Sequence, residues 1–128
     1  MKSILLVLLT LSHIVFTQDL DCQKFRTGNF LNVDDKNGNT IIKRTEKYQF
    51  ETKSSGIRIK LKITWIDDCT YRLSFIRGRA PWKKKHRRAG NPAVIVKIVE
   101  TGEDYYIQVS KFEGVDDFEY RSKIEILK

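Results

Sequence analysis

Histidine and cysteine are scarce in this 128-residue chain, and their scarcity limits the chemistry available to it. The chain holds two of each. His13 lies in an apolar N-terminal segment, which leaves His86 as the one histidine beyond it. A Ser-His-Asp site would have to be built on that single residue, and no motif around it supports one. Two cysteines without a histidine cluster make a poor zinc site. We therefore expect no catalytic residue, metal or cofactor.

Long apolar runs are also scarce, and the only one lies at the N-terminus. It follows Lys2 and ends at Thr17, a pattern typical of a secretory signal peptide, and it is too short for a comfortable membrane span. We predict that residues 1–17 are removed and that residues 18–128, 111 residues (128 − 17), form a single domain. The protein is then exported, and is either periplasmic or secreted.

Cys22 and Cys69 both remain in the predicted mature chain. An even number of cysteines in an exported chain favours a disulfide, because oxidising compartments form and preserve such bonds. Two unpaired thiols are the alternative.

The segment 57–76 has the clearest secondary-structure signal. Apolar and polar residues alternate from Ile57 to Trp65 and again after Cys69. A period of two predicts two β-strands with one face toward a core and a cationic face toward water. Matching the apolar faces of the two strands favours a three-residue turn at 66–68, with Trp65 opposite Cys69 and Ile63 opposite Tyr71.

The rest of the chain consists of short alternating segments separated by turn signals. The pattern predicts an all-β fold, a single antiparallel up-and-down meander of about eight strands. It closes as a lipocalin-like barrel; an open, strongly curled sheet and a two-sheet sandwich are the alternatives. An eight-strand meander places Cys22 and the turn before Cys69 at the same end, in agreement with the disulfide. The expected strands are 25–33, 40–44, 47–52, 57–65, 69–76, 93–100, 105–111 and 118–127.

A strongly basic connection, 77–92, interrupts this pattern. Without Lys2 the formal charge falls from +8 to +7, and the seven cations of segment 77–88 account for all of it. Such a cluster attracts an anionic glycan, a lipid headgroup or an acidic protein, whereas nucleic acid is not expected for an exported chain. A solvated connection without a ligand is the alternative. The candidate anion-binding residues are Arg77, Arg79, Trp82, Lys83, Lys84, Lys85, Arg87 and Arg88.

The neighbouring carboxylates at 67–68 and at 116–117 are candidates for an acid/base pair. Both fall at predicted turns, where aspartate is common because it bonds its own backbone. Asp35, Asn37 and Asn39 have the spacing of calcium ligands, but the glycine is misplaced for such a loop. We interpret all of these as turn residues.

These observations favour a non-enzymatic binding or interaction protein. One version holds a small apolar ligand inside the barrel, and the candidate lining residues are Tyr71, Phe75, Tyr105 and Ile107. Complete filling of the barrel by its own side chains is the alternative. The second version binds an anionic partner through the basic segment. A small hydrolase is the third hypothesis, and the scarcity of histidine disfavours it.

Several short motifs resemble a family of small exported proteins from Bacteroidota that has no settled function. They are C-x2-F-x-T-G-x-F from Cys22, I-x-R from Ile42, Q-x-E from Gln49, and W-x3-C-x-Y-x-L from Trp65. Members sometimes carry the label "DNA topoisomerase IV", which the size of this chain does not support. The resemblance implies a shorter or less basic connection than 77–88. The opening motif is also similar to the Gly-x-Trp start of lipocalins, an analogy at the level of fold.

Overall fold

The structure, a computed structural model, describes residues 19–78 and 92–128. The predicted signal peptide, 1–17, and most of the basic connection lie outside these residues. Within them the fold is all-β, with one 3-10 turn, η1 (Gln23–Phe25), as the only helical element.

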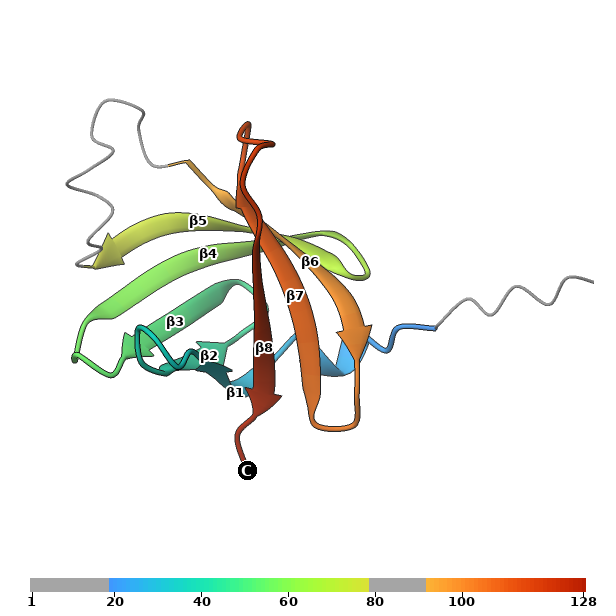
Figure 1. Ribbon diagram of the computed structural model, residues 1–128, viewed down its shortest axis with the longest axis horizontal. Coiled ribbons are helices and arrows are strands. Elements are labelled where there is room, and N and C mark those ends of the chain that lie inside the picture. The colour runs from blue at the N-terminus through green and yellow to red at the C-terminus, as the bar shows by residue number, and fades with distance from the viewer. Residues whose placement is uncertain (1–18, 79–91) are drawn as a thin grey trace, which may run out of the picture.

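Eight antiparallel strands follow one another around a closed barrel (Figure 1). The last strand pairs with the first, for example Phe30 with Ile126, which closes the barrel. The predicted up-and-down meander is confirmed, and the open sheet and the sandwich are excluded. The strands are β1 (Gly28–Val33), β2 (Thr40–Arg44), β3 (Tyr48–Lys53), β4 (Arg58–Asp67), β5 (Thr70–Gly78), β6 (Val94–Thr101), β7 (Tyr105–Phe112) and β8 (Tyr120–Ile126).

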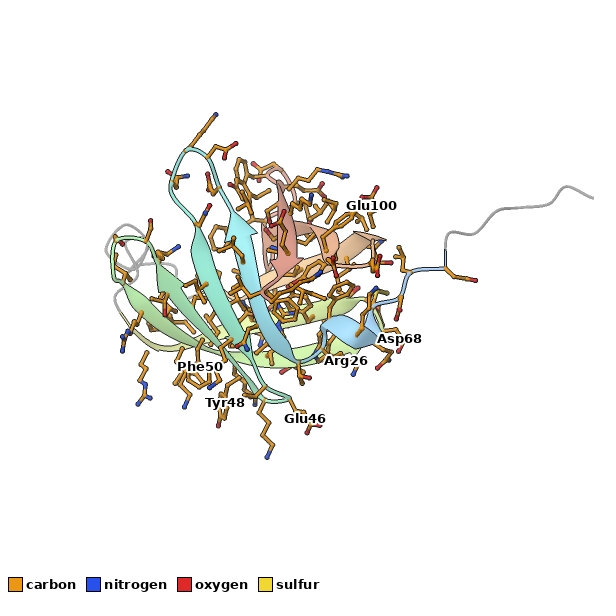
Figure 2. All side chains as sticks on the ribbon, turned by 90° about the horizontal axis from the view of Figure 1, so that it is seen from below. Arg26, Glu46, Tyr48, Phe50, Asp68 and Glu100 are labelled. Carbon is orange, nitrogen blue, oxygen red and sulfur yellow. A yellow bond between two sulfur atoms is a disulfide. The ribbon has the colours of Figure 1, made fainter. Side chains whose placement is uncertain are left out.

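The alternating pattern of β4 produces the expected two faces. Ile59, Leu61 and Ile63 are buried in the barrel, whereas Arg58 and Lys62 are exposed. Figure 2 shows the same division on β3, where Tyr48 and Phe50 point away from the interior. Burial of one face therefore fixes the register of these strands.

The predicted three-residue turn between β4 and β5 is wrong. Asp67 pairs with Thr70, so the turn has two residues, and Trp65 lies opposite Tyr71. A bulge at Ile66, between these two pairs, absorbs one residue and keeps the apolar faces matched. Matching the apolar faces correctly required one extra residue between the two strands. The prediction placed this residue in the turn, whereas it lies in β4 as the bulge.

The two ends of the barrel differ. We call the end that holds η1 and the β2–β3, β4–β5 and β6–β7 turns the disulfide end. The far end is where β3, β5 and β7 end and β4, β6 and β8 begin. No helix among the described residues is long and apolar enough to cross a membrane.

The first strand begins later than predicted. Residues 23–25 form η1, and Gly28 opens β1 with a φ of 132°, a conformation that favours glycine. This bend turns Phe25 into the disulfide end, where its ring is fully buried against Phe30 and Tyr106. The ring of Phe25 therefore plugs that end.

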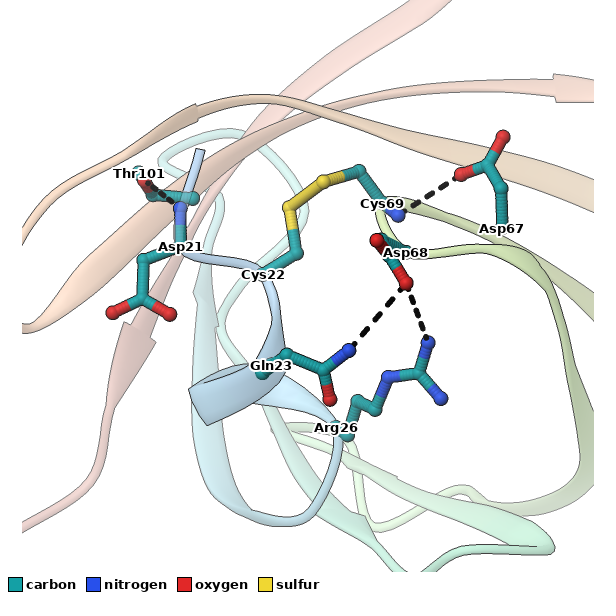
Figure 3. The surroundings of a disulfide bond; sticks show 8 residues. All are labelled: Asp21, Cys22, Gln23, Arg26, Asp67, Asp68, Cys69 and Thr101. Atoms are coloured by element: carbon teal, nitrogen blue, oxygen red, sulfur yellow. Dashed lines mark hydrogen bonds and ion pairs between the residues drawn. A yellow bond between two sulfur atoms is a disulfide. The ribbon is translucent and has the colours of Figure 1, made fainter. Parts of the chain in front are cut away.

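The predicted disulfide is confirmed. Cys22 bonds Cys69, with 5.4 Å between their Cα atoms, and ties η1 to the β4–β5 turn (Figure 3). Next to the disulfide, Oδ1 of Asp68 accepts a hydrogen bond from Gln23 and forms an ion pair with Arg26. Backbone bonding of Asp67 to Cys69 holds the pKa of the Asp67 carboxyl below its ordinary value.

The disulfide closes a long loop, which leads to a first prediction. Replacing both cysteines, Cys22→Ala with Cys69→Ala, should lower the free energy of unfolding by up to about 4 kcal/mol, because the open chain gains entropy when unfolded. Urea unfolding of the variant and of the wild type measures this difference. The unreduced wild type should also lack two thiol hydrogens by mass. Free thiols, or equal stabilities, would contradict the assignment.

Candidate functional site

A buried arginine lies at the disulfide end of the barrel interior. Thr40, Ile42 and Arg44 alternate on β2 and share its inward face. Only 2% of the Arg44 surface is exposed. A charge removed from water in this way costs several kcal/mol unless the protein supplies partners. The surroundings of Arg44 must therefore replace its hydration shell.

Hydrogen bonds and ring faces provide this replacement. Nε donates to Oε1 of Gln49 at 2.9 Å, and Nη1 donates to the backbone oxygen of Phe25 at 2.7 Å. Nη2 donates to the hydroxyls of Tyr71 at 3.2 Å and Tyr106 at 2.9 Å. The guanidinium carbon also lies 4.8 Å from the ring centres of Tyr71 and Phe30. Arg44 thus connects η1, β3, β5 and β7.

The protonation states of Arg44 and Tyr71 follow from their surroundings. Desolvation lowers the pKa of Arg44, but Tyr71, Tyr106 and Glu51 together raise it by more, so it lies above its ordinary value. Arg44 is therefore charged at physiological pH. Burial raises the pKa of Tyr71 well above its ordinary value, against the opposing effect of the Arg44 charge. Tyr71 is therefore neutral and keeps its hydroxyl proton.

These states fix the direction of the next hydrogen bonds. The Tyr71 hydroxyl donates to Oε1 of Gln108 at 2.9 Å. Its single proton is then used, so in the 3.0 Å contact between the two tyrosine hydroxyls Tyr106 is the donor. On the other side, Nε2 of Gln49 donates to Oε2 of Glu51 at 3.0 Å. Two chains of hydrogen bonds therefore run from Arg44 toward the far end.

A cavity of about 350 Å³ occupies the barrel between this network and the far end. Two of its lining residues, Phe118 and Tyr120, are 62% and 44% exposed, so the cavity reaches the surface beside the β7–β8 connection, at the far end. The lining residues are Asn32, Ile42, Gln49, Glu51, Lys53, Leu61, Tyr71, Leu73, Val94, Val96, Gln108, Ser110, Lys111, Phe112, Phe118, Tyr120 and Ser122.

The wall of the cavity has an apolar and a polar side. Strands β4–β6 contribute mainly aliphatic side chains, with Leu61, Leu73 and Val96 buried. Strands β7, β8, β1 and β3 contribute amides, hydroxyls, the carboxylate of Glu51 and the ammonium groups of Lys53 and Lys111. Oδ1 of Asn32 and Oγ of Ser122 are buried there without a hydrogen-bond partner. This wall suits a molecule that is apolar along one side and polar along another.

Of the four predicted lining residues, only Tyr71 lines this cavity. Phe75 packs against the core cluster instead. For β7 the predicted inward face is wrong: Tyr106 and Gln108 point inward, so Tyr105 and Ile107 occupy the opposite face. The Tyr105 hydroxyl bonds Glu100, which raises the pKa of Tyr105.

The predicted anion-binding segment is only partly described. Arg77 is not in a loop but in β5, where it pairs with Lys60 of β4. The other candidates, Arg79, Trp82, Lys83, Lys84, Lys85, Arg87 and Arg88, lie outside the described residues, as does His86.

The neighbouring carboxylates lie at turns. Asp67 accepts a hydrogen bond from the backbone of Cys69, and Asp116 pairs with Lys111 at 2.9 Å. Asp34 precedes the residues with the spacing of calcium ligands, Asp35, Asn37 and Asn39. It accepts hydrogen bonds from the backbone N–H groups of Asn37 and Lys36, and these bonds lower the pKa of the Asp34 carboxyl. No group of three or more potential metal ligands occurs among the residues that the structure describes.

Sequence reasoning did not identify the polar residues that define the site. Arg44 carried a usable signal, because it shares the inward face of β2 with Ile42. Gln108, Ser122 and Asn32 carried none, since a polar residue in a strand is normally assigned to the solvent face. Gln49 and Glu51 belong to a motif of the family resemblance, but no role had been assigned to them.

Comparisons with models of protein families, with curated proteins and with solved structures found no match to this chain. The geometry of the barrel therefore carries the functional argument.

The bonding of Arg44 predicts a large effect of its removal. Arg44→Met should lower the free energy of unfolding by about 3–5 kcal/mol, because buried polar groups of Gln49, Tyr71 and Tyr106 lose their partner. Urea unfolding measures the change. The matched control is Arg77→Met, at an exposed cation of β5, with an expected change within about 0.5 kcal/mol. Equal losses for the two variants would contradict a central role of Arg44.

Proposed function

We propose that this protein is an exported, non-enzymatic binding protein that holds a small, mostly apolar molecule inside its barrel. The observation that carries the proposal is the cavity of about 350 Å³ between the Arg44 network and the far end. Its volume falls in the range of small-molecule sites, roughly 300–1,000 Å³. In this proposal the disulfide end is closed by the Phe25 plug, and the ligand enters at the far end.

The composition of the wall supports this proposal. Binding sites for small molecules are mainly apolar and contain a few placed polar groups. Leu61, Leu73 and Val96 provide the apolar part, and the amide and hydroxyl groups of β7 and β8 provide the polar part. The plugged end adds support, because a buried network that is bonded throughout keeps water out from that side.

Export is supported by the disulfide and by the N-terminal segment. Disulfides form and persist in oxidising compartments, and the Cys22–Cys69 bond ties the plug to the barrel. Residues 1–17 have the pattern of a signal peptide.

Filling the cavity provides the test. The wild type should bind the neutral dye 1-aminoanthracene saturably, measured by its fluorescence. Leu73→Trp places a large ring in the cavity and should weaken binding at least tenfold. Ile76→Trp, at an exposed position of the same strand, is the matched control and should bind like the wild type. Absence of saturable binding by the wild type, or equal binding by Leu73→Trp, would contradict the proposal.

A second candidate function is binding of an anionic glycan on the outer face of β2–β5. Register places Lys43, Phe50, Lys60 and Arg77 in one row across these four strands. Lys62 and Arg58 extend it along β4. None of these five cations forms an ion pair with a described residue. An unneutralised row of cations beside aromatic rings suits a chain of sulfated sugars.

The salt concentration that elutes the protein from immobilised heparin tests this second function. Neutralising the face with Lys43→Gln, Lys60→Gln and Lys62→Gln should lower that salt concentration markedly. Each contact between an exposed cation and a sulfate is weak and screened by salt, so the binding depends on several of them together. The control is Lys97→Gln, Arg121→Gln and Lys123→Gln, which removes the same charge from β6 and β8. Equal shifts for the two triple variants would show that only net charge matters and would exclude a site on this face.

A further inference from the structure

We infer that the polar end of the cavity ligand is electrically neutral and carries both a hydrogen-bond acceptor and a donor, as a carboxamide does. The inference rests on the proposed function and names the ligand chemistry of that same cavity. It follows from three features: the donors that Arg44 has already used, the fixed orientation of Gln108, and the position of Glu51.

Arg44 is not available to bind a carboxylate ligand. A guanidinium has five N–H donors. Four of those of Arg44 already bond Gln49, Phe25, Tyr71 and Tyr106. Arg44 is also absent from the cavity wall, which begins at Tyr71 and Gln49. A ligand carboxylate would have to displace internal partners to reach it.

Gln108 presents donors to the cavity. Its Oε1 accepts the hydroxyl proton of Tyr71 at 2.9 Å, and the same hydroxyl accepts a hydrogen bond from Nη2 of Arg44. The amide of Gln108 is therefore fixed with its NH₂ group turned away from Tyr71. Gln108 lines the cavity, so this NH₂ can donate to a ligand acceptor. A carbonyl oxygen fits it.

Glu51 presents an acceptor from the opposite side. Because Nε of Arg44 can only donate, Oε1 of Gln49 accepts, and Nε2 of Gln49 must donate to Glu51. This bond engages Oε2 of Glu51 and leaves Oε1 for a donor from the ligand. In an eight-strand barrel β3 and β7 are four strands apart in both directions. Glu51 and Gln108 therefore face each other across the cavity.

Two unpartnered atoms mark the same polar side. Ser122 pairs with Gln108 between β8 and β7, and Asn32 lies on the next strand, β1. Oγ of Ser122 and Oδ1 of Asn32 are buried without a partner. Buried polar atoms in native proteins are normally bonded, so an orphan pair beside a cavity indicates a missing partner such as a ligand. A group that both donates and accepts would satisfy them.

The charges around the cavity disfavour an ionised ligand. A carboxylate beside Gln108 would meet the Glu51 carboxylate, with Arg44 already engaged. Of the two lysines that line the cavity, Lys111 already pairs with Asp116 at 2.9 Å, and Lys53 lies at the far end, where β3 ends. An ammonium group has no acceptor function and would leave the NH₂ of Gln108 unpaired. It would also enter past Lys53 and Lys111, both of which line the cavity. A neutral carboxamide avoids both conflicts.

The experiment compares three probes of one chain length: octanamide, octanoate and octylamine. Each displaces 1-aminoanthracene from the wild type at neutral pH, and the dissociation constants are derived from the loss of dye fluorescence. We expect octanamide to bind at least tenfold more tightly than the other two.

Two variants connect this preference to the residues. Glu51→Gln keeps an acceptor for Gln49 and removes the negative charge, so the ratio of octanamide to octanoate affinity should fall severalfold. Gln108→Leu removes the donor and should lower the ratio of octanamide to dye affinity at least fivefold. The control, Glu46→Gln, removes a charge from the exposed β2–β3 turn and should change no ratio.

The outcomes separate the inference from the proposed function. Equal or tighter binding of octanoate or octylamine would overturn the inference, as would a ratio that Glu51→Gln leaves unchanged. Dye binding without octanamide binding would also overturn it, and the proposed function would stand. Failure of the dye and of all three probes would overturn both.

Discussion

The need to stabilise one buried charge organises this barrel. Arg44 lies inside, away from water, and forms no ion pair with a carboxylate of the described residues. Neutral groups from η1, β3, β5 and β7 replace its hydration, and the ring faces of Phe30 and Tyr71 cover it. These partners cannot be supplied unless the barrel is closed and Phe25 is turned inward. The charge therefore specifies one arrangement of the disulfide end.

The same constraint divides the molecule into a structural and a functional end. Phe25, the Cys22–Cys69 bond and the Arg44 network plug one end. The hydrogen bonds continue through Gln49 and Tyr71, so the polar groups beyond them have fixed orientations. The cavity begins where this network ends. The motifs that carry the family resemblance, from Cys22 to Leu73, include residues of the plugged end as well as Glu51 and Leu73 of the cavity wall.

Much of the fold could be predicted from the sequence, because burial of one face imposes a period of two. That period predicted the strands and their up-and-down order, and the even number of cysteines in an exported chain predicted the disulfide. It failed at Ile66, where a bulge absorbs a residue without breaking the alternation. It also failed on β7, where Ile107 and Val109 face outward while Gln108 and Ser110 line the cavity. Polar residues of a strand are usually assigned to the solvent face, but on β7 they face the cavity. The sequence of the strand alone does not indicate this reversal.

Native mass spectrometry of the protein isolated from the cells that make it tests the central claim most directly. The account predicts an adduct on the wild type that is lost on denaturation and is absent from Leu73→Trp, in which the cavity is filled. The released molecule should be small and neutral at physiological pH. A bare wild-type mass under gentle conditions, or an adduct that Leu73→Trp retains, would contradict a ligand held inside the barrel.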